Sequence, residues 1–302
     1  MPFRRRKKKK GPKRRDRVAL ITFTGDVHSN SKLAVCPAKF ARLKGDGYEA
    51  TKYQRWIYGR WLEYWEEIWE LKKRLKWPLY CVYHGELADD NKHSKTDSIS
   101  KNPADVIKLA AEVLKIPLEI GDFHIVLRGT EAHVGVESWM DEQVAVDISA
   151  VKISDPDEES ITALAWRAKI AGVRFDVAHH PGHGHMRPWT KGGDANRLAA
   201  DVLYRYAEHN HSMRRQGERE LATPDIVYRG HNHKPSDSGD NHPIRAIITP
   251  SWQLGIQSGF GHRLGGNILP IGGDYVSINK GIPTIVKKHW RWPLSDYWIP
   301  ED

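Results

Sequence analysis

The chain alternates between short apolar runs and longer amphipathic segments, an order typical of α/β proteins. Runs rich in β-branched and aromatic residues predict strands at 18–23, 79–83, 124–127, 161–168, 173–178, 225–228, 244–249 and 275–286. Apolar residues spaced three or four apart predict helices at 53–77, 104–114, 137–148 and 194–208. No repeat or interior linker interrupts this series, so we expect one domain from residue 17 to residue 302.

The helix predicted at 53–77 carries an aromatic stripe. Two functions are open for it: the stripe could stack on nucleic acid bases, or it could be the face that packs against the core. We favour the core face, because large apolar residues at this spacing usually pack inside. The stripe consists of Trp61, Leu62, Trp65, Ile68, Trp69 and Leu71.

Potential metal ligands follow five of the predicted strands. Residues two apart on an extended chain point the same way, so Asp26 and His28 could bind one ion. The carboxyl ends of strands in an α/β sheet meet at one edge, where sites form. Imidazole mixed with carboxylate suits manganese, iron, zinc or nickel. The ligands are Asp26 and His28, Glu86, the turn at 130–133, His179 and His180, and His231 and His233.

These strand ends resemble, in order, the motifs of the calcineurin-like metallophosphoesterases. The matching segments are Gly25-Asp26-Val27-His28, Gly85-Glu86, Gly129-Thr130-Glu131-Ala132-His133, His179-His180-Pro181 and Gly230-His231-Asn232-His233. The resemblance covers about residues 18–252, and the segments at 128–135 and 249–254 look like the variant of phage and prophage members. It implies two packed β-sheets flanked by helices, an α-β-β-α sandwich, with a binuclear metal site at the carboxyl ends of the strands.

Carried over residue by residue, the resemblance assigns most ligands directly. Asp26, His28 and His233 would bind the first metal ion, and His179 and His231 the second. Glu86 stands where the family has the aspartate that bridges both ions. Glutamate is one methylene longer, so bridging is still feasible, but the spacing or the metal preference could shift.

The third motif departs from the family pattern. The asparagine ligand of the family falls on Thr130, a poor ligand while neutral, so Glu131 or His133 could replace it. The catalytic histidine maps to Glu131 by position and to His133 by chemistry, and we favour His133 as the catalytic acid with Glu131 as a ligand. Arg128 or His183 could contact the phosphate.

The loop after the second predicted strand offers further ligands. Asp89, Asp90 and His93 could coordinate an ion in place of Glu86, although a solvated polar loop is the simpler interpretation.

Two divalent ions would clamp a phosphoryl group and activate a water for in-line attack. The sequence therefore predicts a metal-dependent phosphoesterase that hydrolyses phosphodiesters, nucleic acid among them, with manganese as the favoured metal. One alternative is a nucleic-acid-binding protein with a degenerate, non-catalytic metal site. The other is a phosphomonoesterase.

Charge is distributed unevenly along the chain. The formal net charge is +9, but residues 1–17 alone carry +10, so the rest is nearly neutral. We expect residues 1–16 to form a disordered basic tail that could bind DNA or RNA, and residues 17–302 to form the metallophosphoesterase domain. With two isolated cysteines, no signal peptide and no apolar run of about 20 residues, the chain is expected to be cytoplasmic and not membrane-bound. The oligomeric state stays open.

Overall fold

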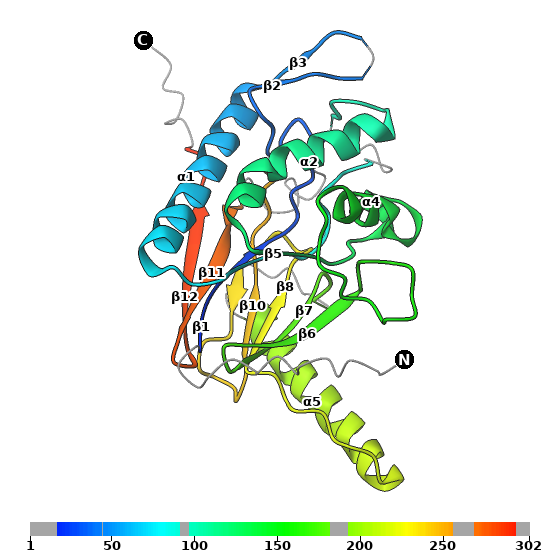
Figure 1. The fold of residues 1–302 in the computed structure, drawn as a ribbon, viewed down its shortest axis with the longest axis vertical. Helices are drawn as coiled ribbons and strands as arrows, with labels where there is room; N and C mark the ends of the chain where they lie inside the picture. The colour runs from blue at the N-terminus through cyan, green and yellow to red at the C-terminus, as the bar shows by residue number, and fades with distance from the viewer. Residues whose placement is uncertain (1–16, 44, 91–96, 182–192, 256–268, 294–302) are drawn as a thin grey trace, which may run out of the picture.

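The computed structural model describes residues 17–43, 45–90, 97–181, 193–255 and 269–293, and its core is two five-stranded sheets (Figure 1). The first sheet has the order β12-β11-β1-β4-β5, with β1 Val18–Thr24, β4 Leu79–Tyr83, β5 Phe123–Val126, β11 Ile271–Asn279 and β12 Ile282–Trp290. The second has the order β6-β7-β8-β10-β9, with β6 Ala165–Ile170, β7 Val173–Ala178, β8 Ile226–Arg229, β9 Ser236–Asp237 and β10 Arg245–Ile248. A small hairpin pairs β2 Lys39–Phe40 with β3 Tyr48–Glu49.

The two large sheets pack against each other through their inner faces. Phe23 of β1 stacks on Tyr228 of β8 with ring centroids 3.7 Å apart, and it also contacts Phe175 of β7 at 5.7 Å. Around these rings, alternate residues of the strands form one buried apolar cluster. Burial of these side chains between the sheets joins the two halves of the chain into one core.

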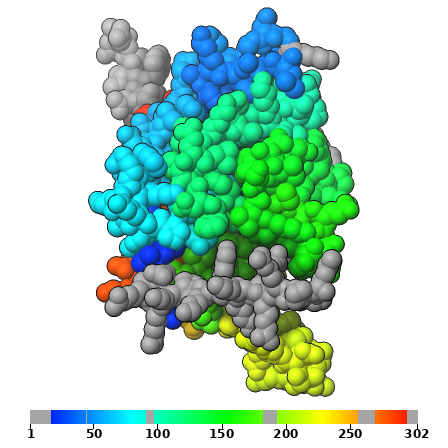
Figure 2. All heavy atoms as spheres, viewed as in Figure 1, coloured from blue at the N-terminus to red at the C-terminus, as the bar shows by residue number. Residues whose placement is uncertain are grey.

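Helices cover the outer faces of both sheets. The first sheet is covered by α1 Lys52–Leu75 and α2 Pro103–Ile120, with α4 Trp139–Asp147 beside them, and Figure 2 shows these three helices side by side on one face. The second sheet is covered by α5 Gly193–Gln216, which packs on β8 and β10. This arrangement confirms the expected sandwich of two sheets flanked by helices.

The Trp-rich helix α1 uses its stripe mainly for the core. Trp61, Trp65 and Ile68 are fully buried beneath the helix, as the packing interpretation predicted. The stripe is narrower than expected, because Leu62 and Trp69 are each 40% exposed. Tyr64, which the periodicity did not single out, is buried instead and donates a hydrogen bond to the main-chain oxygen of Asp274 at 2.9 Å.

Some predicted boundaries were wrong. Helix α2 starts at the expected Asn102 cap but continues past Leu114 to Ile120, through Pro117, because its last turns still contribute buried apolar residues. The helix predicted at 137–148 is α4, which begins two residues later, after a single 3-10 turn at Val136–Ser138. The short helix α3 Glu131–Val134 before it was not predicted. A strand predicted from 161 begins at Ala165 as β6.

Parallel pairing brings the ends of strands from both sheets to one edge. β1, β4 and β5 are parallel in the first sheet, and β7, β8 and β10 are parallel in the second. Main-chain hydrogen bonds join the segments that follow them: the N–H of Asp26 donates to Gly85 O, and that of Gly230 donates to His179 O, both at 2.9 Å. This edge is where the predicted ligands lie.

None of the described helices is long and apolar enough to cross a membrane.

Candidate metal centre

Six buried or half-buried side chains converge where the parallel strands end. We call them the strand-end cluster. They come from four separate segments of the chain, which follow β1, β4, β7 and β8, and the structure brings all six together as the sequence predicted. The cluster consists of Asp26, His28, Glu86, His179, His231 and His233.

The first half of the cluster is formed by Asp26, His28, Glu86 and His233, whose ligand atoms lie within 4.8 Å of one another. His28 Nε2 lies 3.1 Å from both Glu86 Oε2 and His233 Nε2, and His233 Nε2 lies 3.4 Å from Asp26 Oδ1. Ligands at about 2.1 Å from a tetrahedral ion are about 3.4 Å apart, so these separations fit one transition-metal ion.

The second half shares Glu86 with the first. His179 Nε2 lies 3.0 Å from Glu86 Oε1, and His231 Nδ1 lies 3.2 Å from His179 Nε2. The two carboxylate oxygens of Glu86 therefore face different groups of imidazoles: Oε2 faces His28, and Oε1 faces His179. Despite its extra methylene, Glu86 lies where a residue bridging two ions would have to lie. The group of Glu86, His179 and His231 fits a second ion that has three protein ligands and open positions, as metal ions in catalytic sites do.

The main chain of the cluster is held in an unusual conformation. Asp26, His28, Glu86, His231 and His233 all have positive φ, between 48° and 67°. A non-glycine residue pays a conformational penalty there, and such residues gather at functional sites when the surrounding structure enforces them. The strand-end turns thus direct the ligand side chains inward at a cost to backbone stability.

Opposite charges in the cluster shift the pKa values of its members. Burial alone would raise the pKa of Glu86, but the surrounding histidines, His179 first, hold it well below its usual value. Burial would lower the pKa of His179, but Glu86 and Asp26 raise it to about 9. Burial likewise opposes protonation of His28, whose pKa is raised well above its ordinary value by Asp89 and Glu86. Without ions, the cluster therefore holds protons where cations would bind.

His84, which the sequence analysis did not single out, is buried behind the cluster. Its main-chain oxygen lies 2.8 Å from His179 Nδ1, which places the proton of His179 on that nitrogen and leaves Nε2 as the ligand atom. The ring of His84 fills the space beside Gly25 and Gly230, where an added Cβ would lie 2.1 and 2.6 Å from its Nδ1. This close packing explains why glycine precedes both Asp26 and His231.

Asp89 and His133 form a pair beside the first half of the cluster. Asp89 is 3% exposed; its Oδ2 lies 3.3 Å from His28 Nδ1, and its Oδ1 lies 3.3 Å from His133 Nδ1. The preference for a solvated loop at Asp89 was therefore wrong, because the loop folds back under the cluster. Asp90 is exposed, and His93 lies outside the described residues. The contact of His133 Nδ1 with Asp89 leaves Nε2 as the second nitrogen of the ring.

Asp141 is a further buried carboxylate that the sequence analysis missed. It accepts hydrogen bonds from the main-chain N–H groups of Glu86, Leu87 and Gly129 at 2.8–3.0 Å. Burial raises the pKa of Asp141 to about 6 against the effect of these bonds. It sits on the inner side of helix α4 and joins the turn that carries Glu86 to the turn after β5, so it positions the main chain of Glu86.

Two candidates of the third motif do not join the cluster. Glu131 is exposed in the first turn of α3, where its carboxylate accepts a hydrogen bond from the N–H of Glu137 at 3.1 Å. Arg128 donates to Thr162 Oγ1 at 3.1 Å and to Ser160 Oγ at 2.7 Å, so its guanidinium fixes the loop before β6.

Thr130 does reach the cluster, through its hydroxyl, which donates to Glu86 Oε1. A threonine at this position therefore orients the shared carboxylate, where an asparagine would offer an amide oxygen to an ion. His183 lies outside the described residues.

Comparisons with known proteins give weak overall similarity. No protein-family model and no curated protein sequence matches the chain. Among solved structures, an archaeal phosphodiesterase is 13% identical with a TM-score of 0.37, covering 89% of this chain and 99% of its own. A dimetal phosphatase from Danio rerio is 9% identical with a TM-score of 0.40, covering 90% and 99%. Vps29 from Chaetomium thermophilum is 9% identical with a TM-score of 0.31, covering 91% and 98%. What this chain can do chemically follows from the side chains of the cluster itself.

Proposed function

We propose that this chain is a metal-dependent phosphoesterase that hydrolyses phosphodiesters with two divalent transition-metal ions. The observation that carries the proposal is the placement of Glu86 between two sets of imidazoles. One oxygen lies 3.1 Å from His28 Nε2 and the other 3.0 Å from His179 Nε2. A single carboxylate shared in this way is suited to a pair of ions, with Asp26 and His233 completing one set and His231 the other.

The donor set defines the metals that fit. Imidazole nitrogens and carboxylate oxygens suit manganese, iron, zinc and nickel, and manganese is our first choice. When bound, a pair of such ions polarises the phosphoryl oxygens and lowers the pKa of a water for attack on phosphorus. Asp26, Glu86 and the four histidines of the cluster would hold the ions, and His28 would be oriented by Asp89 through its Nδ1.

His133 is assigned the role of general acid. Asp89 holds its Nδ1 at 3.3 Å, and the ring lies edge-on to His28 with centroids 4.7 Å apart. The side chain is 30% exposed, so it borders both the cluster and the solvent from which a substrate enters. A proton on Nε2 can then pass to the oxygen of the leaving alcohol as the P–O bond breaks.

The first experiment combines metal content with hydrolysis. We expect the purified protein to bind about two equivalents of manganese and to hydrolyse bis(p-nitrophenyl) phosphate faster than p-nitrophenyl phosphate. His231→Ala should lose the second ion and most turnover, whereas His211→Ala, at an exposed position on α5, should retain both. Two bound ions without turnover would favour the non-catalytic alternative, and a preference for the monoester would favour a phosphomonoesterase.

The general acid is tested separately by varying the leaving group. His133→Ala should retain both ions but lose about 10²–10⁴-fold in kcat on a diester with an alkyl leaving group. The loss should be much smaller on bis(p-nitrophenyl) phosphate, because p-nitrophenolate leaves without a proton. An equal loss on both substrates would show that His133 does not supply the proton.

Nucleic acid is the finer substrate proposal, and the basic tail motivates it. Residues 1–16 lie outside the described residues, so the proposal depends on their charge in the sequence alone. Deleting them should weaken binding to DNA or RNA and flatten its salt dependence. Unchanged binding after the deletion would show that the tail does not bind the nucleic acid.

A further inference from the structure

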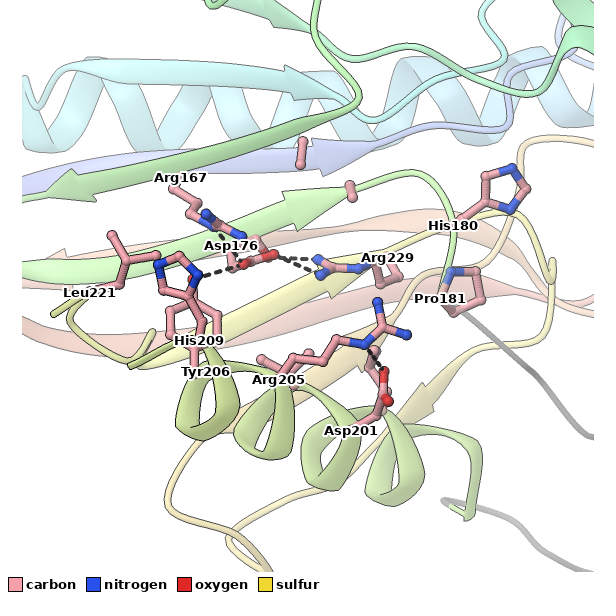
Figure 3. A pocket seen from close by; sticks show the side chains of 14 residues that line it. Arg167, Asp176, His180, Pro181, Asp201, Arg205, Tyr206, His209, Leu221 and Arg229 are labelled. Atoms are coloured by element: carbon pink, nitrogen blue, oxygen red, sulfur yellow. Dashed lines mark hydrogen bonds and ion pairs between the residues drawn. The ribbon is translucent and has the colours of Figure 1, made fainter. Parts of the chain in front are cut away.

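A cavity opens beside the strand-end cluster, between helix α5 and the outer face of β6, β7 and β8 (Figure 3). It measures about 430 Å³, within the range of small-molecule sites. It exists because α5 packs over β8 and β10, while β6 and β7 present the small side chains of Ala165 and Ala178 on this side. The first strands of the second sheet are thus left partly uncovered.

His180 connects this cavity with the cluster. It follows the ligand His179 directly, lines the cavity, and its ring centroid lies 4.3 Å from that of His231. In Figure 3, His180 and Pro181 stand at one end of the cavity, and Leu221 and His209 stand at the other. A molecule held at the second half of the cluster therefore has a space next to it into which the rest of the molecule can extend.

The charges that line the cavity leave a net positive charge. Asp176, which is 3% exposed, is shared by two guanidiniums: Arg229 Nη2 lies 2.6 Å from one oxygen, and Arg167 Nε lies 3.3 Å from the other. Tyr206 also donates to Asp176 at 3.0 Å. One buried carboxylate with two arginines leaves one cation without a counter-charge. Both oxygens of Asp176 are paired with these guanidiniums, which offset its negative charge.

Arg167 and a third arginine that lines the cavity, Arg205, keep donors for a ligand. Arg205 pairs with Asp201 through Nε at 3.0 Å, and Arg167 uses its Nε for Asp176. Among the described residues, no hydrogen bond or ion pair involves the terminal nitrogens of either side chain. In Figure 3, the Arg205 guanidinium lies on the side of α5 that faces Arg229 and Pro181. A planar pair of N–H groups is the preferred partner of a phosphate.

We propose that this cavity binds a second phosphate of the substrate, next to the scissile one, with Arg205 and Arg167 as its donors. The inference rests on the proposed function for the identity of the scissile phosphate. It adds a substrate class: diesters that carry a second phosphate next to the scissile one, such as a short oligonucleotide, rather than isolated diesters.

The test measures binding by calorimetry on the manganese-loaded protein, with thymidine 5′-monophosphate and thymidine 3′,5′-bisphosphate as probes. We expect the bisphosphate to bind at least about tenfold more tightly, since it gains a charge-assisted hydrogen bond. Arg167→Gln combined with Arg205→Gln should reduce this ratio to near one. Both side chains are more than half exposed, so the variant should fold. Arg197→Gln, an exposed arginine of the same helix outside the cavity, should keep the ratio.

Equal affinity for the two probes in the unmodified protein would overturn the proposal, as would a ratio that survives the double substitution. Hydrolysis of bis(p-nitrophenyl) phosphate, measured in parallel, reports on the proposed function independently. If the bisphosphate preference is present and lost in the double variant while no diester is hydrolysed, the cavity binds phosphate as proposed and the proposed function is wrong.

Discussion

Loading the cluster with metal should release protons at neutral pH, and the apparent metal affinity should rise steeply with pH. The perturbation is the pH of a metal titration. A metal ion needs the neutral imidazole of His179, yet Glu86 and Asp26 raise the pKa of His179 to about 9 against the effect of burial. Below pH 9 the ion must therefore displace a proton that the metal-free cluster holds.

The size of the effect follows from this pKa. For this one proton, each pH unit below 9 weakens the free energy of metal binding by about 1.4 kcal/mol, which is about tenfold in apparent affinity. At pH 7 the second ion should therefore bind about fiftyfold more weakly than at pH 9, where half of the His179 side chains are already neutral. His28, whose pKa is also raised well above its ordinary value, adds a second displaced proton in the first half of the cluster.

Calorimetric titration with manganese between pH 6.5 and 8.5, in pairs of buffers with different ionisation enthalpies, measures both quantities. We expect about one proton released per ion at pH 7 and an affinity that rises about tenfold per pH unit throughout. The matched control, His211→Ala, should release as many protons as the unmodified protein. Imidazoles with an ordinary pKa of about 6.5 would give an affinity that levels off above pH 7, and that result would refute the electrostatic account of the cluster.

Three further outcomes are expected from the same structure. Without metal, the raised pKa of His179 stabilises the fold fully below pH 6.5, and this stabilisation is lost as the pH rises toward 9. Urea unfolding in the presence of a chelator should show that the free energy of unfolding falls by up to about 3 kcal/mol over this range. Asp141→Ala leaves three buried N–H groups without an acceptor and should cost about 3 kcal/mol or more by thermal unfolding, whereas Asp141→Asn keeps one acceptor and should cost less. Gly25→Ala places a Cβ 2.1 Å from His84 and should lower the free energy of unfolding by about 1–3 kcal/mol. Gly59→Ala, on α1 with no atom within 4 Å, should raise it by up to about 1 kcal/mol, and equal effects of the two substitutions would contradict the packing around His84.

The sequence by itself determined the parts of the fold that depend on neighbouring residues. An apolar run such as 79–83 becomes a strand because its side chains are buried on both faces, and β4 has the expected bounds. Asn102 and Pro103 begin α2 as predicted, because a side-chain cap and a proline at the first position act locally. Each ligand of the strand-end cluster was recognisable because it directly follows such a strand.

The tertiary structure alone decided which side chains meet. The sequence alone did not show that Asp89 is buried against His28 and His133. Nor did it show that Asp141 meets the main chain of Glu86 or that His84 meets His179, because long-range pairing of strands makes these contacts. Glu131 lies within two residues of His133 in the sequence, yet the first turn of α3 directs it to solvent. The cavity under α5 likewise depends on which strands the helix leaves uncovered. The physical reason is that the hydrophobic period and the helix caps are set by residues close together in the sequence. Contacts between ligand side chains depend instead on how the two sheets pack.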